Sequence, residues 1–169
     1  MREELIEATS SALSAVIAPR YYETERGFHG RFYSALQNEL TRMGFADGRN
    51  LLEMEYQKTV EIHGTGQRPD IVLHVPRPAD GDAAVDNVAV WALKRRASES
   101  AALHDFQKLD VMFRTLNYPL GFFVNVDDQR SHRSAYTGEF PERLVAIAVH
   151  LENGRAHITV DERFRADLP

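Results

Sequence analysis

Hydrophobic residues recur at helical spacing in the first quarter of the chain. Apolar positions three or four residues apart in residues 3–17 predict an amphipathic helix, which Pro19 ends. A second apolar stripe covers residues 28–43. Thr24 is placed to cap its start, and Gly44 suits the left-handed conformation that often follows a helix. The chain is therefore predicted to begin with two consecutive helices.

The pattern then changes to the two-residue alternation and short apolar runs typical of β-strands. A third amphipathic stripe, residues 103–116, predicts a helix that Ser98 or Ser100 can cap and that ends before Pro119. The predicted strands are residues 51–57 (with a possible extension to Ile62), 70–76, 87–94, 120–126 and a hairpin over 144–162 that turns at Asn153 and Gly154. Helices interleaved with clustered strands predict an α/β (α+β) fold, with a mixed central sheet flanked by helices.

Composition fits a globular protein and excludes several classes. The length of 169 residues predicts a single domain, residues 1–169. The chain has no cysteine, which excludes disulfides, thiolate metal sites and cysteine nucleophiles. No apolar run reaches the ~18 residues of a membrane span, and the acidic N-terminal segment does not resemble a signal peptide, so we expect a cytoplasmic protein with no membrane partner. The net charge of -5 disfavours a nonspecific nucleic-acid coat.

Candidate chemistry gathers where two predicted strands lie side by side. Side chains alternate along a strand, so Ala92 and Lys94 point to the same face. Asp70 stands at the start of the preceding strand. If the two strands pair, Asp70, Ala92 and Lys94 converge at one end of the sheet, beside the backbone carbonyl of Leu93.

This arrangement resembles the PD-(D/E)xK nuclease superfamily, the restriction-endonuclease-like phosphodiesterases. Pro69 and Asp70 match the first half of its signature, Lys94 matches the closing lysine, and residues 24–126 follow its core order of helix, three strands, helix and strand. The chain adds an N-terminal helix and a C-terminal hairpin. The resemblance implies hydrolysis of nucleic-acid phosphodiesters with Mg²⁺ or Mn²⁺. Asp70, a second acid and the carbonyl of Leu93 would hold the cation, and Lys94 would orient the attacking water.

The chain departs from the family pattern at one position, because Ala92 stands where the family has Glu or Asp. Alanine offers no ligand to a cation, so we expect this chain to be inactive or nearly so. Either Ala92 is a deliberate inactivating substitution, or the natural protein has lost catalysis and kept the fold to bind nucleic acid or a protein partner. We favour the first explanation because the flanking motif residues are intact.

Further acids are candidate auxiliary ligands. Members of the superfamily often carry an acid on the strand before the Pro-Asp pair, which is Glu55 here, and some recruit an acid from the early helix, which is Glu25 here. An exposed, solvated carboxylate explains Glu55 nearly as well. His29, one turn after Glu25, is a more speculative candidate. The remaining histidines, among them His150 and His157, show no ligand spacing along the sequence.

Phosphate contacts are predicted from basic and polar residues around the signature. Gln107 and Lys108 on the third helix resemble family residues that reach the phosphate, and Arg95 and Arg133 offer fixed positive charges. Solvation of a helix face or loop explains these residues about equally well. The expected partner is nucleic acid, DNA in preference to RNA. The small size and acidic balance suggest a homodimer or a larger assembly.

Overall fold

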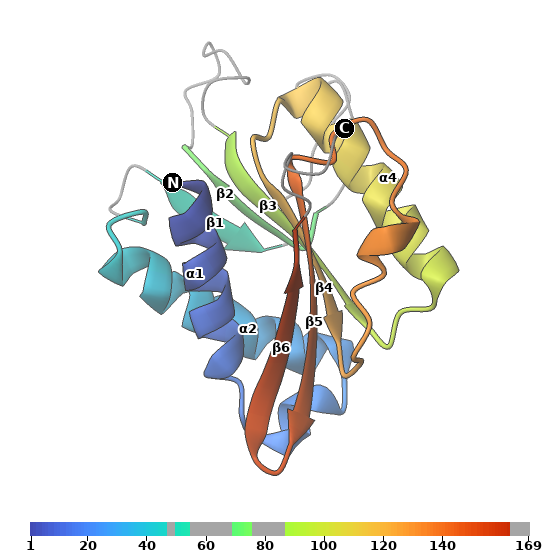
Figure 1. Cartoon of the computed structure of the whole chain (residues 1–169). Coiled ribbons are helices and arrows are strands. Elements are labelled where there is room, and N and C mark those ends of the chain that lie inside the picture. Colours follow the sequence, from blue (N-terminus) through green and yellow to red (C-terminus); the bar gives the residue numbers. More distant parts are fainter. Residues whose placement is uncertain (47–49, 55–68, 76–86, 163–169) are drawn as a thin grey trace.

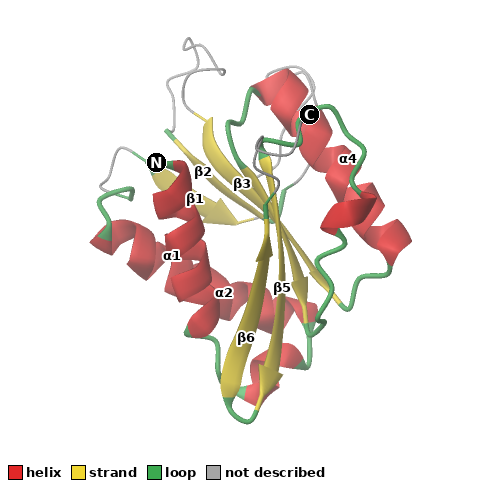
Figure 2. Ribbon diagram, viewed as in Figure 1, coloured by secondary structure: helices red, strands yellow, loops and turns green. Residues whose placement is uncertain are grey.

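The computed structural model describes residues 1–46, 50–54, 69–75 and 87–162. Within them, six strands form one mixed sheet with the spatial order β1-β2-β3-β4-β5-β6, which is also their order along the chain. The pairs β1/β2, β2/β3 and β5/β6 are antiparallel, whereas β3/β4 and β4/β5 are parallel. Helices α1 and α2 lie against one face of the sheet and α4 against the other (Figures 1 and 2). The predicted α+β fold with a mixed central sheet is therefore confirmed.

The elements follow the predicted order. They are α1 (Arg2–Ser14), the 3₁₀ turn η1 (Pro19–Tyr22), α2 (Glu25–Arg42), β1 (Leu51–Met54), β2 (Ile71–His74), β3 (Asn87–Arg95), α4 (Glu99–Leu116), β4 (Gly121–Val126), the 3₁₀ turn η2 (Arg133–Ala135), β5 (Leu144–Glu152) and β6 (Arg155–Asp161). No helix among these is long and apolar enough to cross a membrane.

The predicted caps are in place. Thr24 caps α2 by accepting a hydrogen bond from the amide of Gly27 at 3.0 Å, and the side chain of Ser98 caps α4 in the same way. Gly44 follows α2 with a positive φ of 79°. The hairpin turns at Asn153 and Gly154, which both have positive φ, as a two-residue turn between antiparallel strands requires.

The first helix is shorter than predicted. It ends at Ser14 rather than at residue 17, and Ile17 is 53% exposed. The reason lies in Pro19, because a proline disfavours the helical conformation in the residue before it, and Ala18 is extended. Pro19 itself starts η1. The predicted extension of the first strand to Ile62 lies outside the described residues.

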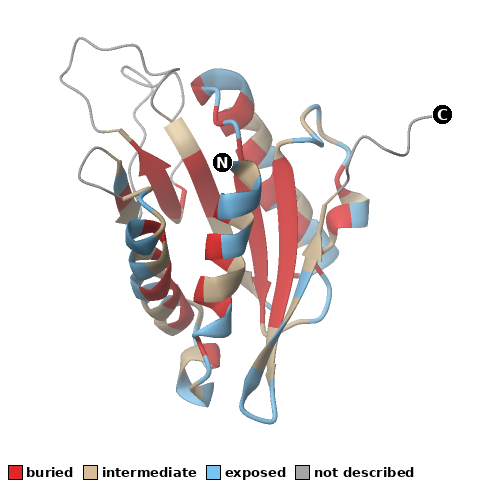
Figure 3. Ribbon diagram, turned by 60° about the vertical axis from the view of Figure 1, so that its left-hand side comes forward, coloured by how far each residue is buried: buried red, intermediate tan, exposed pale blue. Residues whose placement is uncertain are grey.

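Two hydrophobic layers hold the sheet between its helices. Alternate residues of β3 belong to different layers: Trp91 and Leu93 pack under α1 and α2, whereas Val90 packs under α4 and Ala92 borders that layer. Trp91 is fully buried, stacks on Phe122 at 5.1 Å and donates a hydrogen bond to Thr9. The central strands are buried on both faces (Figure 3). This packing fixes which side of β3 each residue faces.

Candidate active site

The register of β2 and β3 brings the motif residues together. Ile71 pairs with Trp91, so Asp70, one residue before β2 begins, falls opposite Ala92. Directly opposite residues of an antiparallel pair point to the same face, and Lys94 shares that face with Ala92. They line a pocket of about 70 Å³, together with residues of α2 and α4. Its lining is Glu25, Pro69, Asp70, Ala92, Leu93, Lys94, Asp105, Lys108, Leu109 and Met112.

Two carboxylates accept hydrogen bonds from backbone amides of β3 that, within the described residues, have no partner strand at the end of the sheet next to the pocket. The amide of Leu93 donates to Oδ2 of Asp70 at 2.7 Å, and the amide of Arg95 donates to Oε2 of Glu25 at 3.0 Å. Both amides point toward the side of β3 where β2 would continue, but β2 begins only at Ile71. An unpaired buried amide is costly, so Asp70 and Glu25 are held in fixed positions by the backbone. In a strand the carbonyl of Leu93 points to the same side as its amide, next to Asp70.

Two lysines balance part of the negative charge in the pocket. Nζ of Lys94 is 3.8 Å from Oε1 of Glu25, and Nζ of Lys108 is 2.8 Å from Oδ1 of Asp105. Within the described part of the chain, Asp70 forms no ion pair. Three carboxylates and two ammonium groups thus face one small hollow.

The pKa of Asp70 is raised above its usual value. The main cause is burial, which disfavours the charged form, and the negative charges of Asp105 and Glu25 act in the same direction. The hydrogen bond from the amide of Leu93 and the proximity of His29 lower the pKa but do not outweigh burial. A cation placed between these carboxylates would relieve their mutual repulsion.

Sequence reasoning missed Asp105. This residue of α4 is only 7% exposed and lines the pocket. A signal was available, because position 105 lies on the buried stripe of the helix, where an acid is unexpected unless it has a partner or a function. Its carboxylate adds an oxygen donor to those predicted from β2 and α2.

Of the other predicted residues, one lines the pocket, three lie elsewhere in the fold and one lies outside the described residues. Lys108 lines the pocket, whereas Gln107 lies on the exposed face of α4 and is not among the lining residues. Arg95 turns away to bind the carbonyl of Tyr22 at 2.6 Å and Asp127 at 2.8 Å. Arg133 is buried in η2, where its guanidinium donates to the carbonyl of Pro141, and it lines a different hollow. Glu55 lies outside the described residues.

The donor set suits a hard divalent cation in part. Asp70, Glu25 and Asp105 offer carboxylate oxygens and Leu93 offers a carbonyl oxygen, which are the ligands that Mg²⁺ and Mn²⁺ accept. A hollow of about 70 Å³ also has room for several water molecules, which Mg²⁺ usually retains. Ala92, which also lines the pocket, contributes only a methyl group. The carboxylate and carbonyl oxygens of the pocket therefore fit such a cation in part.

Comparison with known proteins identifies no relative. No family model, no curated protein and no solved structure matches this chain. The pocket geometry and the motif residues are therefore the basis on which function is inferred.

Proposed function

We propose that this chain is a metal-dependent nuclease of the PD-(D/E)xK type, with a restriction-endonuclease-like fold, and that Ala92 leaves its cation site incomplete. The observation that carries the proposal is the β2/β3 register, because it brings Asp70 opposite Ala92 on the face that carries Lys94. The element order α2, β1, β2, β3, α4, β4 supports it, since this is the core order of that superfamily.

The pocket residues have distinct roles in this proposal. Asp70, Glu25 and the carbonyl of Leu93 would hold Mg²⁺ or Mn²⁺, and Asp105 would be a further oxygen donor from α4. When bound, the cation stabilises charge on the phosphoryl oxygens and lowers the pKa of a coordinated water. Lys94, whose side chain is 43% exposed, orients the attacking water at the pocket entrance.

Substrate binding in this proposal depends on fixed positive charge near the pocket. The side chain of Lys108 lines the pocket and is 42% exposed, so its ammonium group would be available to a substrate phosphate. The net charge of -5 means that such contacts are local rather than spread over the molecule. The substrate class is nucleic acid, with DNA preferred to RNA.

Ala92 explains why this chain should hydrolyse slowly or not at all. With alanine at position 92, β3 offers no side-chain oxygen, so a bound cation would have fewer ligands and would stabilise the transition state less. Changes in the partners of metal ligands alone reduce affinity or activity by about 10- to 100-fold. Losing a direct ligand should cost at least about 100-fold.

The test is to restore the carboxylate with Ala92→Glu. The variant and the parent chain are incubated with single- and double-stranded DNA and RNA in Mn²⁺, and Mn²⁺ binding is measured by calorimetry. We expect metal-dependent cleavage by Ala92→Glu and at least about 100-fold tighter Mn²⁺ binding than in the parent.

The matched control is Ala92→Gln, which has the shape of glutamate without its charge and should not restore cleavage. Adding Lys94→Met to Ala92→Glu should abolish cleavage while leaving Mn²⁺ binding in place. A folded Ala92→Glu variant that binds no Mn²⁺ would overturn the proposal.

A second candidate function is a catalytically dead module that binds nucleic acid or a protein partner through the same fold. Ala92 favours it, and so does the pairing of both pocket lysines with carboxylates, which balances their charge without a cation. This candidate predicts that the parent chain binds nucleic acid equally well in EDTA and in Mn²⁺. It also predicts that Ala92→Glu stays inactive on every substrate.

A further inference from the structure

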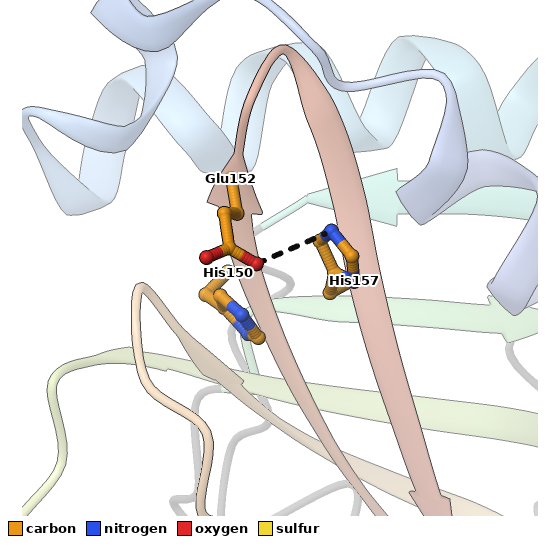
Figure 4. Close-up of side chains that lie close together, drawn as sticks. All are labelled: His150, Glu152 and His157. Carbon is orange, nitrogen blue, oxygen red and sulfur yellow. Dashed lines mark ion pairs between the residues drawn. The ribbon is translucent and has the colours of Figure 1, made fainter.

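A second group of ligand-bearing side chains lies on the hairpin of β5 and β6, and none of them lines the pocket. His150 on β5 and His157 on β6 are directly opposite each other in the strand register. Glu152 is two residues after His150, so its side chain points to the same face of β5. Figure 4 shows the three side chains gathered on that face near the turn. The turn predicted at Asn153 and Gly154 already implies that positions 150 and 157 lie opposite each other, although their spacing along the sequence does not suggest a metal site.

The distances between the candidate ligand atoms are only slightly longer than those between the ligands of a coordinated cation. The two imidazole rings are nearly parallel, with centroids 5.2 Å apart, and Nε2 of His157 is 3.7 Å from Oε2 of Glu152. One ligand atom from each residue can be chosen so that all three lie within 4.8 Å of one another. Around a tetrahedral Zn²⁺ with bonds of ~2.1 Å, ligand atoms are about 3.4 Å apart. Small side-chain rotations would therefore close the site.

The strand pairing of the hairpin holds the backbone of the three residues in place without a cation. The pairing of β5 with β6 runs from Ala146 to Glu152, so the backbone that carries the three ligands is already fixed. The side chains of His157 and Glu152 are 49% and 62% exposed. Arg155 is opposite Glu152 in the register, yet the ion pair of Glu152 is with His157. Only the side chains, and not the backbone that carries them, would therefore have to be ordered when a cation binds.

We propose that His150, His157 and Glu152 bind a borderline transition-metal cation of the Zn²⁺ class and so link β5 to β6 beside their turn. Imidazole nitrogens select such ions, whereas Mg²⁺ and Ca²⁺ require oxygen ligands. The site differs in ligands and in expected metal from the pocket around Ala92. Three protein ligands leave at least one position for water.

The experiment uses the full chain carrying Asp70→Asn, which disables the pocket as a competing site. Zn²⁺ is titrated by calorimetry at pH 7.5. We expect one Zn²⁺ site that is lost on combining His150→Gln with His157→Gln. Each single His variant removes a direct ligand and should weaken Zn²⁺ binding by at least about 100-fold. Glu152→Gln should weaken it by a smaller factor, and excess Mg²⁺ should not displace Zn²⁺.

The matched control is His104→Gln, which removes an exposed histidine of α4 and should leave Zn²⁺ binding unchanged. Long-range ¹⁵N spectra of the imidazoles should show Zn²⁺-dependent shifts for His150 and His157. Equal Zn²⁺ affinity in the parent and in the double His variant would overturn the proposal, and so would the absence of saturable binding. Neither outcome depends on nuclease activity, so this proposal and the proposed function can fail separately.

Discussion

Asn125 is expected to be a main source of stability at the end of the sheet that carries the pocket. It lies in β4, is fully buried and pairs in register with Lys94. Its Oδ1 accepts a hydrogen bond from the amide of Ala97 at 2.8 Å, and its Nδ2 donates to the carbonyl of Arg130 at 2.8 Å. One side chain thus holds both the segment after β3 and the loop after β4.

Replacing Asn125 with leucine should destabilise the fold by about 4 kcal/mol. The substitution leaves one buried amide and one carbonyl without partners, and each such loss costs about 1–3 kcal/mol. Asn125→Asp keeps the acceptor for Ala97 but loses the donor to Arg130, and it also introduces a buried charge. It too should therefore be strongly destabilising at neutral pH.

The assay is urea unfolding at 25 °C, followed by circular dichroism and by the fluorescence of Trp91, the single tryptophan. Gln107→Leu, on the exposed face of α4, is the control and should change the free energy of unfolding by less than about 0.5 kcal/mol. If Asn125→Leu unfolds within about 0.5 kcal/mol of the parent, these two hydrogen bonds do not have the assigned role.

Three further predictions follow from individual contacts. Burial raises the pKa of Asp70, so its ionised carboxylate destabilises the folded state, and Asp70→Asn should unfold at a higher urea concentration than the parent at pH 7. This gain in stability should vanish as the pH falls below ~4, and an equal gain at pH 3 would contradict burial as the cause. Thr24→Ala removes the cap on the amide of Gly27 and should cost about 1 kcal/mol, measured as a lower Tm that Thr24→Ser largely restores. Gly121→Ala places a methyl group 2.5 Å from the Phe113 ring and should cost about 1–3 kcal/mol in urea, a loss that Phe113→Leu partly relieves in the double variant.

The local elements were predictable because their signals lie close together in the sequence. The stripe that starts at Phe28, the Thr24 cap and the Asn153-Gly154 turn each depend on residues within a few positions of one another. The predicted end of α1 at residue 17 was wrong because the apolar side chain of Ile17 was assumed to be buried in the helix stripe. Pro19 shaped the local backbone and left that side chain in solvent.

The candidate site was only partly predictable because it depends on register. The alternation within β3 was enough to place Ala92 and Lys94 on one face, but the position of Asp70 opposite Ala92 required the pairing of two strands. Asp105 enters from α4, and nothing local to α4 indicates which strand it covers. His150 and His157, by contrast, are brought together by the hairpin, whose register follows from the predicted turn at Asn153 and Gly154.

Asp70 and Glu25 have a structural reason to be present whether or not a cation binds, because each accepts a backbone amide of β3. Their presence therefore does not distinguish a nuclease from a catalytically dead module. The effect of a carboxylate at position 92 does distinguish them. Ala92→Glu adds a fourth carboxylate to a pocket in which Asp105 and Glu25 already raise the pKa of Asp70.

Without a cation, this repulsion should give Ala92→Glu a lower Tm than Ala92→Gln. Mn²⁺ should reverse the order, because a ligand that binds only the folded state stabilises it in proportion to the logarithm of its concentration. Thermal unfolding of both variants in EDTA and across a Mn²⁺ series measures this directly. If Mn²⁺ shifts the two Tm values equally, the carboxylate at position 92 does not bind the cation, and the pocket is not a PD-(D/E)xK metal site.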